Sequence, residues 1–249
     1  MSTSFEHHGI KHLSPSSLNL FANEPALWVV QYLMGRRFGV GCAAHRGTAS
    51  EEGVQAGLID HKKPIEECQE IAIKKFDALT ALSGDGRREK ERAAIPGIVE
   101  QAITELRQYG PLTGYQGKVV NRFDDLQVDL LGFYDFLFGD AGIIVDLKTS
   151  LKLASAINPA HARQVSHYIR GTNLEGRVCY ATDKRLAVYR VENPMQSFEE
   201  MNNVARRVQR FLSVSKDPYE LAGIVTPRVD EFWWSDPAAR AAALEIYGL

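Results

Sequence analysis

The chain has 249 residues, of which 45% are hydrophobic and 24% are charged, and its formal net charge at pH 7 is −2. This composition excludes an intrinsically disordered chain, which has fewer apolar residues and a larger charge imbalance. Apolar stretches such as residues 26–34 are too short to span a membrane, and residues 1–14 lack the apolar core of a signal peptide. We therefore expect a cytoplasmic protein without a membrane partner, whose length suits one compact domain.

The three cysteines, Cys42, Cys68 and Cys179, are widely separated and odd in number. This spacing argues against a disulfide framework, and also against a structural zinc site, which needs paired ligands a few residues apart. We expect all three to be small buried residues of the core.

Helical signals dominate residues 14–110. Ser14 can cap a helix that begins at Pro15, and Pro25 bends or restarts that helix. Apolar residues then recur at three- and four-residue spacing over 46–58 and 64–82. The charged segment 84–92 predicts an exposed loop that leads into a further helix, with Pro96 near the start of that helix.

From Gly117 onward the pattern changes to strands. Residues 119–120, 126–138 and 143–148 predict three strands, separated by turn signals at 124–125 and 139–142. A helix follows over 159–171, then two strands over 177–181 and 186–191, and helices over 195–249. This order predicts a mixed α/β (α+β) fold, in which one mixed sheet carries helices on both faces within a single domain of residues 1–249.

Two acidic residues, Asp135 and Asp146, interrupt otherwise apolar predicted strands. An ionised carboxylate beside a hydrophobic sheet is costly unless another group compensates its charge. Asp146 and Lys148 lie two residues apart and project from the same face, so a simple salt bridge is one interpretation. If the strands pair around the 139–142 turn, however, Asp135 approaches Asp146, and a divalent cation is the natural remedy for their repulsion.

A Mg²⁺ or Mn²⁺ ion held by such oxygens can activate water and compensate negative charge on a phosphodiester. Lys148 would orient that water or stabilise the transition-state charge. Glu51 is the best candidate for a third acidic ligand, and Glu52 beside it is the alternative. A purely structural ion-pair cluster stays open as the other interpretation of these residues.

These residues resemble the PD-(D/E)XK nuclease superfamily, in its RecB-like and lambda-exonuclease-like branches. The resemblance consists of four short motifs in the order of that family, and it covers about residues 14–192. The motifs are Arg46-Gly-Thr-Ala-Ser-Glu51, Gly132-Phe-Tyr-Asp135, Asp146-Leu-Lys-Thr149 and Gln164-Val-Ser-His-Tyr168. The resemblance implies a restriction-endonuclease-like core over about 117–192 together with the helix over 45–59.

The chain departs from the RecB-like pattern at two points. RecB-like members usually carry a metal-binding histidine where this chain has Glu51, and the glutamate is similar to the lambda-exonuclease-like arrangement. Some RecB-like relatives hold an iron–sulfur cluster with four cysteines, whereas this chain has three cysteines and no Cys-x-x-Cys pair. We therefore expect Mg²⁺ or Mn²⁺ and no iron–sulfur cluster.

By this resemblance, the metal ligands are Glu51, Asp135, Asp146 and the backbone carbonyl of Leu147, and Lys148 assists the hydrolytic water. Gln164 and Tyr168 share one helical face and are expected to position the nucleic acid, although they could instead belong to the edge of the core. Three basic residues near the predicted site, Lys152, Arg163 and Arg170, are candidate phosphate contacts, although such residues look the same in sequence as solubilising ones.

The resemblance implies a metal-dependent DNA exonuclease that acts on linear duplex or single-stranded ends in recombination, repair or phage DNA metabolism. Its implied partners are DNA, copies of the same chain in a ring, and a single-strand annealing or recombination protein; a phage-encoded protein would act in the host cytoplasm. A non-catalytic DNA-binding or assembly subunit, an endonuclease and an RNase of the same fold stay open as alternatives. The aromatic residues Phe232, Trp233 and Trp234 could stack on bases, but docking in the core or a subunit contact is the favoured interpretation.

Overall fold

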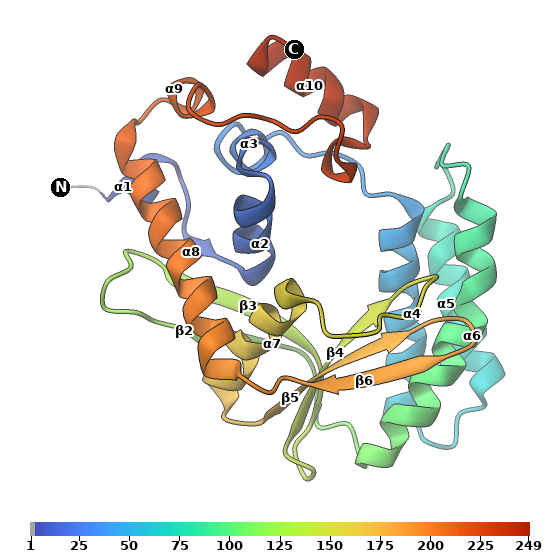
Figure 1. The fold of residues 1–249 in the computed structure, drawn as a ribbon. Helices are drawn as coiled ribbons and strands as arrows, with labels where there is room; N and C mark the ends of the chain where they lie inside the picture. Colours follow the sequence, from blue (N-terminus) through green and yellow to red (C-terminus); the bar gives the residue numbers. More distant parts are fainter. Residues whose placement is uncertain (1–2) are drawn as a thin grey trace. The chain divides into compact units, whose positions relative to one another are not determined.

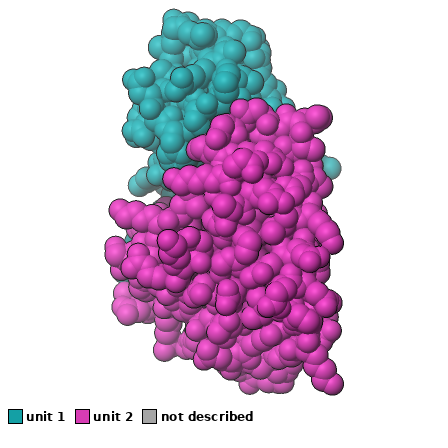
Figure 2. Space-filling model, turned by 90° about the vertical axis from the view of Figure 1, so that its right-hand side faces the viewer, with its two compact units in different colours: residues 1–39, 119–132, 195–249 teal, residues 40–118, 133–194 magenta. Residues whose placement is uncertain are grey.

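A computed structural model describes residues 3–249 of the chain (Figure 1). The contacts between residues divide the chain into two compact units (Figure 2). Unit 1 contains the residues up to Gly39 together with Val119–Gly132 and Met195–Leu249, and unit 2 contains Val40–Lys118 and Phe133–Pro194. The single domain over residues 1–249 stays a prediction, since two compact units can belong to one folding domain.

A mixed β-sheet is confirmed, and the described residues contribute six strands to it. The strands pair in the order β1-β3-β4-β5-β6, and β2 pairs with β3 off this path. The β1–β3 and β4–β5 pairs are parallel, whereas β3–β4 and β5–β6 are antiparallel. The strands are β1 (His12–Leu13), β2 (Gly114–Asn121), β3 (Asp129–Phe138), β4 (Ile143–Thr149), β5 (Glu175–Ala181) and β6 (Leu186–Arg190).

In unit 2, helices cover both faces of the central strands β4 and β5. One face, which includes Val145 and Cys179, packs in a single hydrophobic cluster with α4 (Cys42–Ile59), α5 (Ile65–Leu79) and α6 (Arg88–Leu106). Figure 1 shows these three helices side by side. On the opposite face lies α7 (Pro159–Thr172), whose Val165 and Ile169 are close enough to Gly176 of β5 that any side chain there would clash. The predicted arrangement of helices on both faces is therefore confirmed.

Two glycines allow α4 to lie unusually close to its neighbours. A Cβ atom at Gly53 would lie 2.6 Å from the Cys68 carbonyl oxygen of α5, and one at Gly57 would lie 2.6 Å from Ile103 Cδ1 of α6. Glycine in a helix costs roughly 1 kcal/mol relative to alanine. Close packing offsets that cost here, and it fixes the position of the helix that carries Glu51.

Unit 1 is mostly helical and has its own core. Trp28, Leu130 and Met201 belong to one of its hydrophobic clusters, and Trp234 is fully buried in another. The predicted docking of Trp234 in the core is thus confirmed, whereas Phe232 is exposed. The elements are α1 (Ser4–His7), α2 (Pro15–Asn23), α3 (Pro25–Trp28), the π-helical turn η1 (Val29–Leu33), α8 (Pro194–Val214), α9 (Pro218–Ala222), the 3₁₀ turn η3 (Phe232–Trp234) and α10 (Pro237–Tyr247).

The structure corrects two predicted elements. Residues 88–92 are helical and not part of a loop, because α6 begins at Arg88, and Pro96 therefore lies inside α6 and not near its start. Glu91, predicted to be exposed, is buried, because it pairs with the guanidinium group of Arg46. The second predicted strand begins at Asp129 and not at Leu126, whose side chain packs in the core of unit 1.

The cysteines and the helices agree with two further predictions. Cys42, Cys68 and Cys179 are all buried free thiols, as expected for small core residues. None of the helices in residues 3–249 combines the length and the apolar character that a membrane-spanning helix needs.

Candidate active site

The β3–β4 hairpin brings Asp135 and Asp146 together. Its paired residues run from Phe138 with Ile143 to Phe136 with Val145, and one more step in this register places Asp135 opposite Asp146. Next to this position the Leu147 backbone nitrogen donates a hydrogen bond of 2.7 Å to the side-chain Oδ2 of Asp135, and not to a backbone carbonyl of β3. The predicted approach of the two aspartates is therefore present, and it is fixed by a hydrogen bond.

Asp146 is fully buried, and its two carboxylate oxygens have different surroundings. Oδ1 accepts a hydrogen bond of 3.1 Å from Gln164 Nε2. Oδ2 forms an ion pair with Lys148, whose Nζ lies 2.7 Å away. A buried carboxylate is costly unless a cation or hydrogen-bond donors compensate its charge, and Lys148 is the cation that does so here.

Arg46 connects helix α4 to the end of β4. Its Nη2 donates to the Thr149 carbonyl oxygen at 3.0 Å and its Nε donates to Thr149 Oγ1 at 3.3 Å, while its Nη1 pairs with buried Glu91 of α6. Two sequence motifs are thereby joined, because Arg46 begins the Arg46–Glu51 motif and Thr149 ends the Asp146–Thr149 motif. This connection sets the position of Glu51 relative to the strand that carries Asp146.

Glu51 lies in the middle of α4, since the helix begins at Cys42, earlier than predicted. Its Oε1 accepts a hydrogen bond of 2.9 Å from Gln116 Nε2 of β2. Glu52, by contrast, pairs with Lys75 of α5 at 2.8 Å and is occupied by that helix–helix contact. The two neighbouring glutamates therefore have different partners, and the ligand role of Glu51 stays a prediction.

Charge crowding changes the acid–base properties of the site. Burial, followed by the charges of Asp146 and Glu51, raises the pKa of Asp135 well above its ordinary value. Burial alone would lower the pKa of Lys148, but the charges of Asp146 and Asp135 outweigh it and raise that pKa. Lys148 is therefore protonated at neutral pH, and its positive charge only partly compensates three neighbouring carboxyl groups.

Helix α7 presents Gln164 and Tyr168 to the site on one face. Gln164 Nε2 donates to the Tyr168 hydroxyl at 2.8 Å as well as to Asp146. Tyr168 is buried, and burial followed by the charge of Asp146 raises its pKa. These contacts join the fourth sequence motif, Gln164–Tyr168, to the carboxylate cluster.

The three basic residues predicted to contact phosphate occupy different positions. Lys152 is exposed in the loop after β4, Arg163 is half-buried in α7, and Arg170 is exposed near the end of α7. A role in nucleic-acid binding stays a prediction for all three.

The sequence did not predict two residues of β2 that border Glu51. Gln116 donates to Glu51 from a left-handed backbone conformation with a φ of 45°. Tyr115 stacks on Phe136, and burial followed by the charges of Glu51 and Asp135 raises its pKa. The Gln116-Gly117 dipeptide is a weak signal for an irregular strand.

His161 and Tyr180 were also missed, and they form a hydrogen-bonded pair beside Lys148. Tyr180 is paired with Lys148 in the parallel register of β4 and β5. Its hydroxyl accepts a hydrogen bond of 2.9 Å from the Asn158 backbone nitrogen and lies 2.8 Å from His161 Nδ1. The Tyr180 hydroxyl thereby bridges the Asn158 backbone and the imidazole ring of His161. Burial, aided by the Lys148 charge, lowers the pKa of His161 to about 4, so the ring is neutral at pH 7.

The carboxyl groups do not form a preassembled metal cage. Within residues 3–249, no group of three or more His, Cys, Asp and Glu side chains has the spacing to hold a metal ion. Each acid is instead held by a protein donor: Glu51 by Gln116, Asp135 by Leu147 and Asp146 by Gln164. The donor set nevertheless suits a hard divalent cation, because it consists of mutually repelling carboxylate oxygens that a single ammonium group, that of Lys148, only partly compensates.

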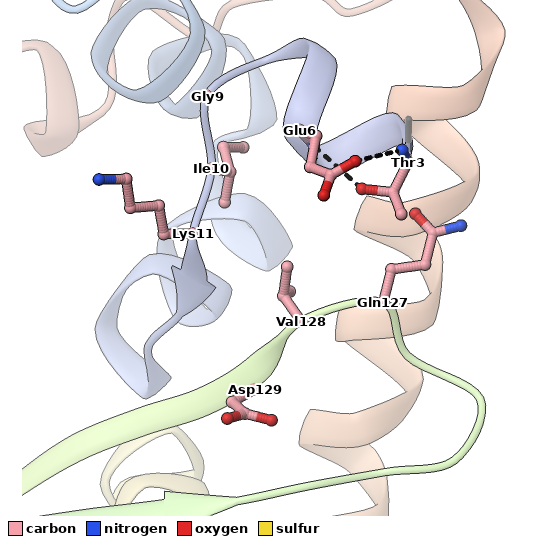
Figure 3. Close-up of a pocket in the computed structure, with 8 residues that line it drawn as sticks. All are labelled: Thr3, Glu6, Gly9, Ile10, Lys11, Gln127, Val128 and Asp129. Carbon is pink, nitrogen blue, oxygen red and sulfur yellow. Dashed lines mark hydrogen bonds between the residues drawn. The ribbon is translucent and has the colours of Figure 1, made fainter. Parts of the chain in front are cut away.

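A pocket of about 500 Å³ in unit 1 contains none of the predicted site residues. Segments 3–11 and 127–129 line it (Figure 3). Its carboxylate Glu6 is engaged with the backbone nitrogen of Thr3 at 2.8 Å as part of the cap of α1. Glu6 is thus occupied by the cap of α1, and the predicted site residues lie outside this pocket.

Comparison with known proteins shows the family of the chain. The chain matches the model of the PD-(D/E)XK nuclease superfamily over residues 12–242 and therefore belongs to that superfamily. Its members are enzymes that hydrolyse nucleic acid, generally with divalent metal ions. The superfamily resemblance and the restriction-endonuclease-like fold expected from the sequence are both confirmed.

The other comparisons add little. No curated protein sequence matches the chain significantly. One similar solved structure, titled "Crystal structure of SSO0001", is 14% identical, with a TM-score of 0.36 over 66% of this chain and 85% of that chain. A TM-score this low supports no conclusion about the chain.

Proposed function

We propose that the protein is a Mg²⁺- or Mn²⁺-dependent deoxyribonuclease that degrades DNA from its ends. The observation that carries the proposal is the convergence of Glu51, Asp135 and Asp146 on the single ammonium group of Lys148, which pairs with Asp146 Oδ2 at 2.7 Å. In a purely structural ion-pair cluster the opposite charges would balance, whereas here one cation faces three carboxyl groups.

The metal ligands in this proposal are carboxylate oxygens of Glu51, Asp135 and Asp146, together with the backbone carbonyl of Leu147. A divalent cation supplies a water nucleophile at neutral pH and compensates the negative charge of the phosphodiester. Gln164 donates to Asp146 Oδ1 and thereby fixes the orientation of the carboxylate, whose Oδ2 faces Lys148. The hydrogen bond from the Leu147 backbone nitrogen likewise fixes the orientation of the Asp135 carboxylate.

Lys148 acts as a charged donor and not as a base. Because Asp146 and Asp135 raise its pKa, Nζ keeps its proton at neutral pH. It can therefore donate a hydrogen bond to a phosphate oxygen or to the attacking water, and so stabilise negative charge that develops in the transition state. Gln164, itself held by Tyr168, would keep the Asp146 carboxylate in its orientation while a DNA strand is bound.

Action on DNA ends is supported by the sequence motifs, since Glu51 replaces the histidine of RecB-like members and is similar to the lambda-exonuclease-like arrangement. We extend the proposal to recombination, repair or phage DNA metabolism inside the cell, with a ring of identical chains and a single-strand annealing or recombination partner. The alternatives are a non-catalytic DNA-binding subunit, an endonuclease and an RNase.

Digestion of three substrates tests this proposal. Mg²⁺-dependent degradation is measured on end-labelled linear DNA, closed circular DNA and RNA of equal length. The proposal expects loss of linear DNA alone, cutting of the closed circle would indicate an endonuclease, and cutting of RNA alone would indicate an RNase. Absence of any digestion with Mg²⁺ or Mn²⁺ would favour the binding subunit.

The variant Lys148→Met tests the assigned site in the same assay. Methionine keeps much of the length of the side chain but removes the positive charge, so turnover should be lost while DNA binding in EDTA persists. Normal turnover by this variant would contradict the assigned site.

A further inference from the structure

Apart from the carboxylate cluster, unit 2 contains a cavity with a volume of about 460 Å³. It is lined by the first turns of α6, by the loop after β4 and by the turn between β5 and β6. Three of its lining residues are basic, Lys90, Lys184 and Arg185, and one is acidic, Asp183. The cavity therefore carries a net positive charge of two, from three cations and one anion.

These three cations differ from most arginines of the chain. The guanidinium groups of Arg88, Arg92 and Arg177, for example, each pair with a carboxylate. Among the described residues, no carboxylate lies within ion-pair distance of the side chains of Lys90, Lys184 or Arg185. Unpaired cations that converge on one cavity provide a local positive surface in a chain whose net charge is −2.

The cavity is connected to the candidate active site through the backbone. Thr149 pairs with Ala181, and the Ser150 nitrogen donates to the Ala181 carbonyl oxygen at 3.0 Å. The lining residues Leu151 and Thr182 follow directly after these two. Leu151 follows Lys148 by three positions in the chain, a span of at most about 11 Å. Since stacked nucleotides advance about 3.4 Å each, the cavity lies within roughly three nucleotides of the cluster.

We propose that this cavity binds the phosphodiester backbone of the DNA strand that the carboxylate cluster cleaves, and that Lys90, Lys184 and Arg185 contact its phosphates. The inference rests on the proposed nuclease function and names the surface that holds the substrate. Leu151, which is 37% exposed, adds an apolar contact for a sugar or base between the charged groups. Asp183 contributes only one negative charge, so the cavity still attracts an anionic strand.

The inference is tested by the salt dependence of DNA binding. The triple variant Lys90→Ala, Lys184→Ala, Arg185→Ala is compared with a control triple variant, Lys62→Ala, Lys63→Ala, Lys74→Ala, which removes the same charge near and along α5. Fluorescence anisotropy of a labelled single-stranded oligonucleotide is measured in EDTA between 50 and 200 mM salt, so that no turnover occurs.

Each phosphate contact contributes about −0.7 to the slope of log K against log salt for a single strand. The cavity variant should therefore bind with a slope smaller in magnitude by about 2, and on the order of tenfold more weakly at 50 mM salt, than the wild type. The control should keep the wild-type slope. Equal slopes for the two triple variants, or no binding by the wild type, would overturn the inference.

Folding is checked by thermal melting, and the single variants Lys184→Gln and Arg185→Gln, in an exposed turn, replace the triple variant if it melts early. Each should reduce the slope by about 0.7, and unchanged slopes would also overturn the inference. Digestion by the wild type is measured in parallel. If the wild type digests DNA but the cavity variant binds DNA as the wild type does, the role of the cavity is refuted and the nuclease function stands. If the cavity variant binds more weakly but the wild type digests nothing, the nuclease function is refuted and the role of the cavity in binding stands.

Discussion

Gln164 of α7 donates a hydrogen bond of 3.1 Å to one carboxylate oxygen of Asp146, while Lys148 Nζ lies 2.7 Å from the other. The second hydrogen of the same amide goes to the Tyr168 hydroxyl, so both hydrogens of the Gln164 amide are engaged. This relationship gives the Gln-x-x-x-Tyr motif a physical role, because it fixes the orientation of the Asp146 carboxylate.

The first prediction concerns that hydrogen bond. Gln164→Ala should lower the rate of digestion at fixed Mg²⁺ by about 10–100-fold, the usual cost of losing a residue that supports a metal ligand. Higher Mg²⁺ should restore part of the rate, since the main loss is in metal affinity. Gln108→Ala is the control, because Gln108 bonds only a helix carbonyl. If the loss of rate in Gln164→Ala is the same at every Mg²⁺ concentration, this role is contradicted.

The second prediction separates the two adjacent glutamates. Glu51→Gln should reduce digestion by at least about 100-fold, more than the loss of a merely supporting residue. Glu52→Gln should leave digestion unchanged and cost at most about 1 kcal/mol of stability, because it breaks only a half-exposed ion pair with Lys75. Rates measured on the same linear DNA decide the matter, and similar losses in the two variants would show that Glu51 has no special role.

The third prediction follows from the raised pKa of Asp135. A carboxyl group whose pKa is higher in the folded chain contributes stability that is complete below its unfolded pKa and is lost as the pH rises through its folded pKa. Asp135→Asn, which keeps an acceptor for the Leu147 nitrogen, should therefore raise the Tm at pH 8 by on the order of 2–4 °C, the effect of about 1 kcal/mol. The gain should shrink at pH 5.

Added Mn²⁺ provides the control for Asp135→Asn. It should raise the Tm of the wild type, because the cation compensates the crowded carboxylates, and should raise the Tm of the variant less. A variant that is less stable than the wild type at pH 8 without metal would contradict the charge-crowding account.

The fourth prediction concerns the left-handed conformation of Gln116. Both Gln116→Gly and Gln116→Ala remove the donor to Glu51, but only glycine adopts a φ of 45° without steric cost. The glycine variant should therefore be more stable than the alanine variant by roughly 1 kcal/mol, or about 2–4 °C in Tm. Equal melting temperatures would indicate that the strand relaxes in the alanine variant.

The central hairpin could be predicted from sequence because its signals are local. Apolar runs end at the 139–142 turn, and the turn fixes which residues oppose each other, so the approach of Asp135 to Asp146 followed from counting. The spacing of Gln164 and Tyr168 likewise placed both on one helical face. Periodicity therefore accounts for most of the candidate site.

Other features depend on contacts that local patterns do not encode. Tyr115 and Gln116 were missed because β2 alternates few apolar residues near its start, and a left-handed residue interrupts it. The start of α6 was misplaced because a charged segment is typical of an exposed loop, whereas Glu91 is buried by pairing with Arg46, 45 residues away in sequence. The His161–Tyr180 pair and the basic cavity also arise only when distant segments meet.

A direct measurement of metal binding tests the central claim, that Glu51, Asp135 and Asp146 together bind a divalent cation. Isothermal titration with Mn²⁺, without nucleic acid, should give saturable binding to the wild type and to Glu52→Gln. Asp146→Ala should lose that binding while its thermal melt stays cooperative. Mn²⁺ binding of unchanged affinity and stoichiometry in Asp146→Ala would contradict the account.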